Sequence, residues 1–122
     1  MTVSTVALIA PGDMGHALGM RLVKDGGLRV VTSLTGRGDR SKALAQKAGM
    51  IHVGDDVDLI RQADIFISVV PPGRALAVAK RFAKAIKAAC KPIVYADLNA
   101  ISPMTAEQVA KAVGSAGARF VD

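Results

Sequence analysis

The sequence predicts an α/β protein with a doubly wound parallel sheet between two layers of helices, a three-layer αβα arrangement. Short segments rich in β-branched residues alternate with segments of helical periodicity along nearly all of the 122 residues. Residues 65–70 form a run apolar enough to be buried on both faces, as central parallel strands are. Strands that alternate with helices are joined by right-handed crossovers and therefore lie parallel in one sheet.

Six strands are expected, at residues 3–10, 28–34, 50–53, 65–70, 92–97 and 118–121. Pro11 and Gly12 end the first strand, and Pro71, Pro72 and Gly73 end the fourth. The sixth strand stands at the end of the sequence.

Helical patterns fill the segments between these strands, at residues 13–24, about 41–49, 55–61, 74–91 and 102–115. Ser102 and Pro103 form a helix start, with a hydroxyl N-cap followed by proline at the first helical position. Ser102 is therefore expected to be a cap rather than a substrate contact.

Composition narrows the class of protein. A single cysteine cannot form an internal disulfide, so an intracellular, cytoplasmic protein is expected, with Cys90 as a small buried residue. His16 and His52 lack neighbours at metal-ligand spacing, so no metal is expected. The longest clearly apolar run is far too short to cross a bilayer.

The formal charge of +6 is concentrated in residues 74–91, which hold six basic residues and no acid. Lys80, Lys84, Lys87 and Lys91 recur at helical spacing opposite apolar residues, which is typical of a solvent-exposed helix face. The alternative is a surface for nucleic acid or an acidic partner. No aromatic residues interleave the basic ones and no nucleic-acid motif is present, so no nucleic-acid partner is expected.

The turn after the first strand carries the clearest binding signal. Ala10-Pro-Gly12-Asp-Met-Gly15 has the form of a Gly-x-Gly-x-x-Gly turn, with alanine in the first glycine position. Gly12 lets a pyrophosphate approach the backbone, Gly15 lets the helix lie close to the strand, and the amides of Asp13, Met14 and Gly15 point at the anion. This predicts a dinucleotide site in a Rossmann-type sheet; the alternative is a merely tight turn.

The end of the second strand indicates which dinucleotide is bound. A carboxylate there selects NAD by binding the ribose 2′-hydroxyl, whereas an arginine accommodates the 2′-phosphate of NADP. Ser33 occupies this position, and Arg37 and Arg40 follow it. NADP is therefore preferred over NAD, although Asp39 could pair with one of the arginines.

The ends of the fourth and fifth strands are further candidates. Pro71 and its neighbours could form a wall beside the ribose and nicotinamide, and Asn99 can donate to and accept from an amide or a substrate hydroxyl. No residue is an evident proton-transfer partner. His16 is expected to be a surface or cofactor-side residue, and we expect no catalytic residue within this sequence.

Taken in order, these motifs resemble the β-hydroxyacid dehydrogenase superfamily, in particular the 6-phosphogluconate dehydrogenase-like NAD(P)-dependent oxidoreductases. The matching segments are residues 11–15, 35–41, 63–72, 97–103 and 117–122. The resemblance implies that Gly12, Asp13 and Met14 contact the pyrophosphate and that Ser33, Arg37 and Arg40 meet the adenosine end. It also implies that Val70 and Pro71 line the middle of the cofactor and that Asn99 lies near the nicotinamide and substrate.

In this superfamily a helical second domain supplies the catalytic lysine and the dimer interface, and no lysine here matches that motif. Residues 1–122 are thus expected to be an NAD(P)-binding domain, with a helical domain downstream, in an enzyme that is a homodimer and transfers hydride between NADP and a small hydroxy acid. The alternatives are a non-catalytic nucleotide-sensing or partner-binding module and, less favoured, an imine reductase.

Overall fold

Strands and helices alternate along the chain in the expected order. The structure, a computed structural model, describes residues 3–9, 13–33 and 39–122. The strands are β1 (Thr5–Ile9), β2 (Arg29–Thr32), β3 (Ile51–His52), β4 (Ile65–Ser68), β5 (Val94–Asp97) and β6 (Arg119–Val121). The helices are α1 (Asp13–Lys24), α2 (Asp39–Lys47), α3 (Asp56–Gln62), α4 (Ala75–Ala89) and α5 (Pro103–Ser115), with a 3-10 turn, η1 (Pro72–Arg74), before α4.

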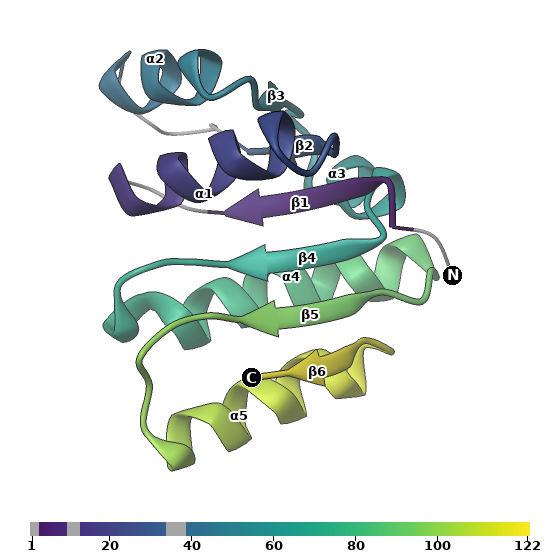
Figure 1. The fold of residues 1–122 in the computed structure, drawn as a ribbon. Helices are drawn as coiled ribbons and strands as arrows, with labels where there is room; N and C mark the ends of the chain where they lie inside the picture. The colour runs from purple at the N-terminus through teal and green to yellow at the C-terminus, as the bar shows by residue number, and fades with distance from the viewer. Residues whose placement is uncertain (1–2, 10–12, 34–38) are drawn as a thin grey trace.

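All six strands are parallel and form one sheet in the order β3-β2-β1-β4-β5-β6 (Figure 1). The order reverses at β1, which lies between β2 and β4. The central strands end in register, because Ile9 pairs with Ser68 and Ser68 pairs with Asp97. The predicted doubly wound parallel sheet is confirmed, and its carboxyl edge at β1 and β4 is the switch point at which such sheets bind ligands.

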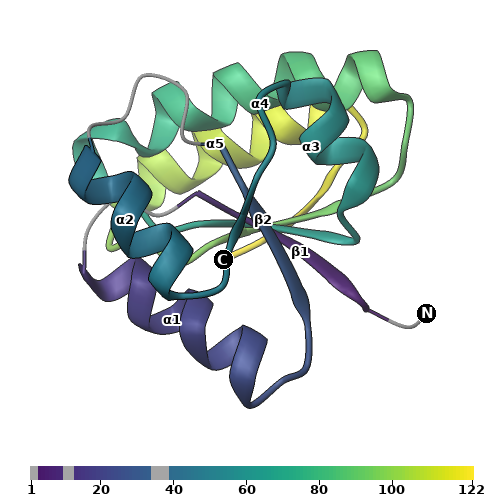
Figure 2. The ribbon, with the colours of Figure 1, turned by 90° about the horizontal axis from the view of Figure 1, so that it is seen from above.

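Helices cover the sheet on both faces (Figure 2). On one face, α3, α4 and α5 enclose the larger core, which includes the aromatic side chains of Phe66, Phe82 and Tyr95. On the other face, α1 and α2 cover a smaller cluster that includes Leu8, Val30 and Met50. This is the predicted three-layer arrangement.

Most strands are shorter than the sequence pattern predicted. β1 begins at Thr5, where the carboxylate of Asp64 accepts hydrogen bonds from the amides of Ser4 (2.9 Å) and Thr5 (3.1 Å). These two backbone hydrogen bonds lower the pKa of Asp64. β4 ends at Ser68 rather than at residue 70, and Ile67 is only half-buried, so its expected burial on both faces is incomplete.

The end of the basic helix corrects two expectations. α4 ends at Ala89, and Cys90 follows in the left-handed conformation with φ 52°, so this cysteine is exposed rather than buried. A left-handed residue commonly ends a helix and turns its side chain away from the helix face. Lys91 therefore does not continue the lysine face; its Nζ donates to the carbonyls of Arg61 (2.7 Å) and Ala63 (2.6 Å) at the end of α3.

The helix start at Ser102 is as predicted. Its Oγ accepts a hydrogen bond from the amide of Thr105 at 3.2 Å, and Pro103 is the first residue of α5. The cap satisfies one of the amides that a helix N-terminus leaves without a partner. No helix among the described residues combines the length and apolar character that a membrane crossing needs.

Candidate cofactor site

The candidate site is the carboxyl edge of the three central strands, where β1, β4 and β5 end at one level. After β4 the chain stays against this edge, because the amide of Val69 donates to the carbonyl of Ile9 at 2.8 Å. The amide of Leu98 likewise donates to the carbonyl of Ser68 at 3.1 Å. The segments that follow the strands therefore begin side by side.

Three side chains at this edge form a hydrogen-bonded group that we call the strand-end clamp: Ser68, Asp97 and Asn99. Asn99 Oδ1 accepts from the amide of Val70 at 2.7 Å, and Asn99 Nδ2 donates to Ser68 Oγ at 3.2 Å. The amide of Asn99 donates to Asp97 Oδ1 at 2.8 Å. The clamp thus joins the end of β5 to the backbone that leaves β4.

Burial shifts the pKa values of two side chains of β5 beneath the clamp, Asp97 and Tyr95. Asp97 is 1% exposed, and burial raises its pKa despite the hydrogen bond from the Asn99 amide. Burial also raises the pKa of Tyr95, two residues earlier on the same strand. Asp97 Oδ2 and the Tyr95 hydroxyl are buried without a hydrogen-bond partner among the described residues. Both polar atoms are therefore unfavourable for stability as they stand.

At the end of β2 the position of the NAD-selecting carboxylate is occupied by the Ser33 hydroxyl, and the Arg81–Asp56 ion pair lies beside it. Ser33 is buried, and Arg81 of α4 lies 3.4 Å from its Oγ through Nη2. The same guanidinium makes two hydrogen bonds to Asp56, at 2.8 and 2.7 Å, and these raise the pKa of Arg81. Sequence reasoning missed Arg81 because 48 residues separate it from Ser33. Arg81 is one of the basic residues in 74–91, and that pattern does not indicate which strand its side chain contacts.

The other residues predicted for the site lie outside the described residues, at the starts of α1 and α2, or at the strand edge. Gly12 and Arg37 lie outside the described residues. Asp13 and Met14 begin α1 at the carboxyl end of β1, Gly15 is buried there, and Arg40 lies in the first turn of α2. Val70 is buried, Pro71 is exposed, and Asn99 is half-buried. The edge brings Val70, Pro71 and Asn99 together; their contact with a cofactor stays a prediction.

The structure contradicts the first part of the prediction that His16 is a surface or cofactor-side residue. It is 7% exposed, so it is not a surface residue. Its position in the first turns of α1, just after Gly15, still allows the predicted place on the cofactor side of the helix.

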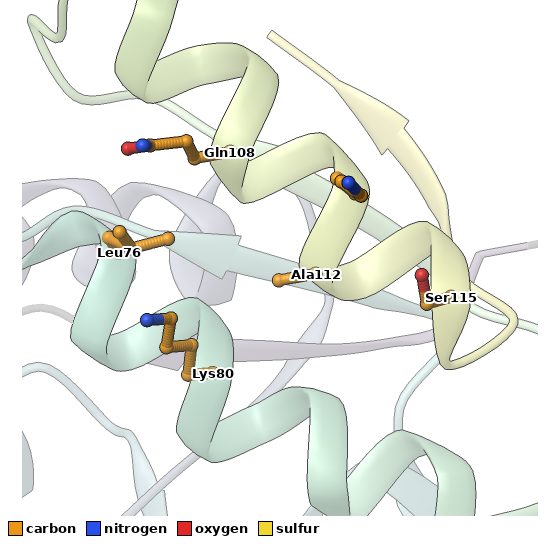
Figure 3. A pocket seen from close by; sticks show the side chains of 6 residues that line it. Leu76, Lys80, Gln108, Ala112 and Ser115 are labelled. Carbon is orange, nitrogen blue, oxygen red and sulfur yellow. The ribbon is translucent and has the colours of Figure 1, made fainter.

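A hollow of about 280 Å³ lies away from the strand edge, between α4 and α5 (Figure 3). Leu76 and Lys80 of α4 face Ala112 and Ser115 of α5 across it. These are the outer surfaces of two helices that cover the sheet, and no clamp residue lines the hollow. It is not part of the candidate cofactor site.

Comparison with known proteins places the chain among oxidoreductases. The sequence model of the family described as "NADP oxidoreductase coenzyme F420-dependent" matches residues 5–100. An uncharacterised 28.5 kDa protein of Methanothermus fervidus is 36% identical over 95 residues, which are 78% of this chain and 35% of that protein.

Solved structures agree on the fold. The conserved protein MTH1747, described as structurally similar to 3-hydroxyacid dehydrogenases, has a TM-score of 0.81 and 30% identity over 97% of this chain and 42% of its own. The 3-hydroxyisobutyrate dehydrogenase of Mycobacterium tuberculosis has a TM-score of 0.75 and 23% identity over 98% of this chain and 39% of its own. The chain thus spans about two fifths or less of the length of these relatives. It belongs to the NADP oxidoreductase, coenzyme F420-dependent family and has the NAD(P)-binding fold of the dehydrogenases that its sequence resembles.

Proposed function

We propose that the chain binds NADP(H) as the cofactor domain of an oxidoreductase that transfers hydride between NADP and a small hydroxy acid. The observation that carries this proposal is the polar end of β2, with buried Ser33 in the place of the NAD-selecting carboxylate, in a chain whose family is named for NADP. The substrate class is supported by the similarity to MTH1747, itself described as similar to 3-hydroxyacid dehydrogenases.

The residues present fit such a cofactor. α1 begins directly beyond the carboxyl end of β1, so the positive end of its dipole faces the switch point of the sheet. At the adenosine end, small Ser33 adds no negative charge of its own, which would repel a 2′-phosphate. NADP, when bound, would supply or accept the hydride at its nicotinamide.

The chain's own part in this function is to bind and orient. The amides of residues 13–15 would hold the pyrophosphate, Arg37 and Arg40 would neutralise the 2′-phosphate, and the Val70-Pro71 segment would line the middle of the cofactor. We assign no proton-transfer role to these residues, because no lysine among residues 1–122 matches the motif to which the resemblance assigns it.

Titration of the purified chain with NADPH and NADH, followed by nicotinamide fluorescence, tests this function. We expect saturable binding of both, with NADPH at least tenfold tighter. Arg37→Ala and Arg40→Ala should reduce that preference, because each removes a cation from the 2′-phosphate. Lys47→Ala, at the far end of α2, is the matched control and should leave it intact. NADPH binding no tighter than NADH, or a preference that survives both arginine substitutions, would contradict the proposal.

Coenzyme F420 is a second candidate reactant, because the family description names it. The two candidates differ in what exchanges hydride with NADP. Incubation of a full-length oxidoreductase that contains this cofactor domain with NADPH and oxidised F420, monitored by F420 absorbance, is compared with its incubation with NADP and a panel of β-hydroxy acids. Turnover in the first assay alone assigns F420, and turnover in the second alone assigns a hydroxy acid.

A further inference from the structure

The strand-end clamp joins residues far apart in the sequence. Asn99 lies 29 residues from Val70 and 31 from Ser68, yet its side chain contacts both. Val70 cannot pair with a strand, because β4 has already ended at Ser68. The Asn99 side chain therefore takes the place of a sheet partner for the first backbone amide that turns into the Pro71 segment.

Both polar atoms of the Asn99 side chain are used within the protein. Oδ1 accepts the Val70 amide at 2.7 Å, and Nδ2 donates to Ser68 Oγ at 3.2 Å. An amide side chain matches these two partners in one orientation only, because its oxygen accepts and its nitrogen donates. The bond from the Asn99 backbone amide to Asp97 Oδ1 holds the residue in the turn that makes this orientation possible.

Ser68 and Asp97 cannot touch a ligand at the edge, since they are 0% and 1% exposed. They lie beneath Asn99 on the face covered by α4 and α5, level with the last residue of β1. Any effect of Ser68 on nucleotide binding must therefore pass through Asn99 and the backbone it holds. Buried partners of this kind fix the orientation of the groups that line a site.

We propose that Asn99 is a positioning residue: it holds the Val70-Pro71 segment against the carboxyl edge of the sheet, with Ser68 and Asp97 fixing its orientation, and so sets nucleotide affinity. This inference rests on the proposed function, because the segment matters only if a nucleotide lies along the edge. In this role Asn99 affects the cofactor indirectly, through the backbone of Val70, in addition to any direct contact.

The test measures two quantities on the same variants: NADPH affinity by titration, and hydrogen exchange of the Val70 amide by NMR. Asn99→Ala should weaken NADPH binding about tenfold and speed Val70 exchange by at least tenfold, because the amide loses its acceptor. Ser68→Ala should weaken NADPH binding several-fold although it removes no ligand contact. Ser115→Ala, at the exposed end of α5, is the control and should change neither quantity.

Asn99→Asp supplies a rescue. Aspartate keeps an acceptor for Val70, and the Ser68 hydroxyl can donate to its second oxygen, so Val70 exchange should return toward the wild-type rate. Thermal unfolding of each variant confirms that affinity is measured on folded protein.

The outcomes separate the two proposals. If the wild type binds neither nucleotide, the proposed function fails and the affinity role fails with it, whereas slow Val70 exchange would still report the hydrogen bond. If the wild type binds NADPH but Ser68→Ala leaves affinity unchanged, Asn99 acts by direct contact and the positioning role is overturned. Unchanged Val70 exchange in Asn99→Ala also overturns it.

Discussion

The two helix layers differ in how they pack on the sheet. The layer of α3, α4 and α5 encloses a large cluster with an aromatic centre, in which the Phe66 ring lies 4.6 Å from that of Phe82 and 4.8 Å from that of Tyr95, centre to centre. The layer of α1 and α2 covers a small cluster whose surrounding apolar side chains, such as Leu18 and Met20, are only partly buried.

This difference indicates that the two layers contribute in different ways, one to stability and the other to the placement of a helix N-terminus. Aromatic side chains bury large areas, so the α3–α5 layer supplies most of the hydrophobic stabilisation. The α1 layer instead brings the N-terminus of α1 close to the switch point. This close approach requires small side chains where α1 packs on the sheet rather than large apolar ones. Gly19 shows this, because a Cβ there would lie 2.6 Å from Met50 Sδ and 3.3 Å from Leu8 Cδ2.

The largest expected effect comes from breaking the aromatic centre. Phe82→Ala should lower the free energy of unfolding by about 3–5 kcal/mol, because Phe82 is fully buried and contacts Phe66. Met50→Ala in the small cluster should cost about 2 kcal/mol, since its half-buried neighbours can relax. Urea unfolding of both variants checks the comparison, and an equal or larger loss for Met50→Ala would contradict it.

A smaller effect tests the close approach of α1. Gly19→Ala should gain about 0.5–1 kcal/mol of helix propensity, as at Gly114, but lose about 1–3 kcal/mol because the added methyl group meets the Met50 and Leu8 side chains, so a net cost of up to about 2 kcal/mol is expected. In the double variant with Met50→Ala the cost should be smaller than the sum by at least about 0.5 kcal/mol, since the closest atom is gone. Gly114→Ala on α5 is the matched control; nothing lies within 4 Å of its Cβ, so it should stabilise the helix by about 0.5–1 kcal/mol. Additive costs at Gly19 and Met50 would show that the contact is unimportant.

The smallest effect is the pH dependence of the clamp. Burial raises the pKa of Asp97 in the folded protein, so stability falls as the pH rises from the ordinary aspartate value through the raised one. Asp97→Asn keeps an acceptor for the Asn99 amide without the charge. It should therefore raise stability at pH 7 by about 1 kcal/mol and lose this advantage below about pH 4.

Asp64 provides the control of opposite sign. Hydrogen bonds from the Ser4 and Thr5 amides lower its pKa, so its contribution to stability is present above the ordinary value and lost as the pH falls through the lowered one. Asp64→Asn should thus destabilise at pH 7 and approach the wild type in acid. Thermal unfolding between pH 3 and pH 7 measures both variants, and parallel curves for the two would refute the assignment.

Local signals predicted the order of elements and the Ser102 cap correctly, because each depends on residues within a few positions. Strand boundaries were less well predicted, since the side chains of distant residues accept the backbone amides there: Asp64 accepts those of Ser4 and Thr5 at the start of β1, and Asn99 accepts that of Val70 beyond the end of β4. The predicted burial of Cys90 was wrong because the helical periodicity was extended beyond Ala89, whereas Cys90 is the left-handed residue that ends α4. In the candidate site, Ser33, Val70 and Asn99 could be chosen from strand ends, but the sequence held no sign that Arg81 meets Ser33.

The sequence by itself determined the alternation of strands and helices and the parallel sheet, because periodicity and turn residues act locally; that a nucleotide binds at the carboxyl edge of this sheet stays a prediction. Only the tertiary structure decided what Asn99, Lys91 and Arg81 contact, with partners 25 to 48 residues away. Those contacts depend on strand register and on which helix lies over which strand. Register and helix placement follow from burying the whole core at once, and no short stretch of sequence specifies them.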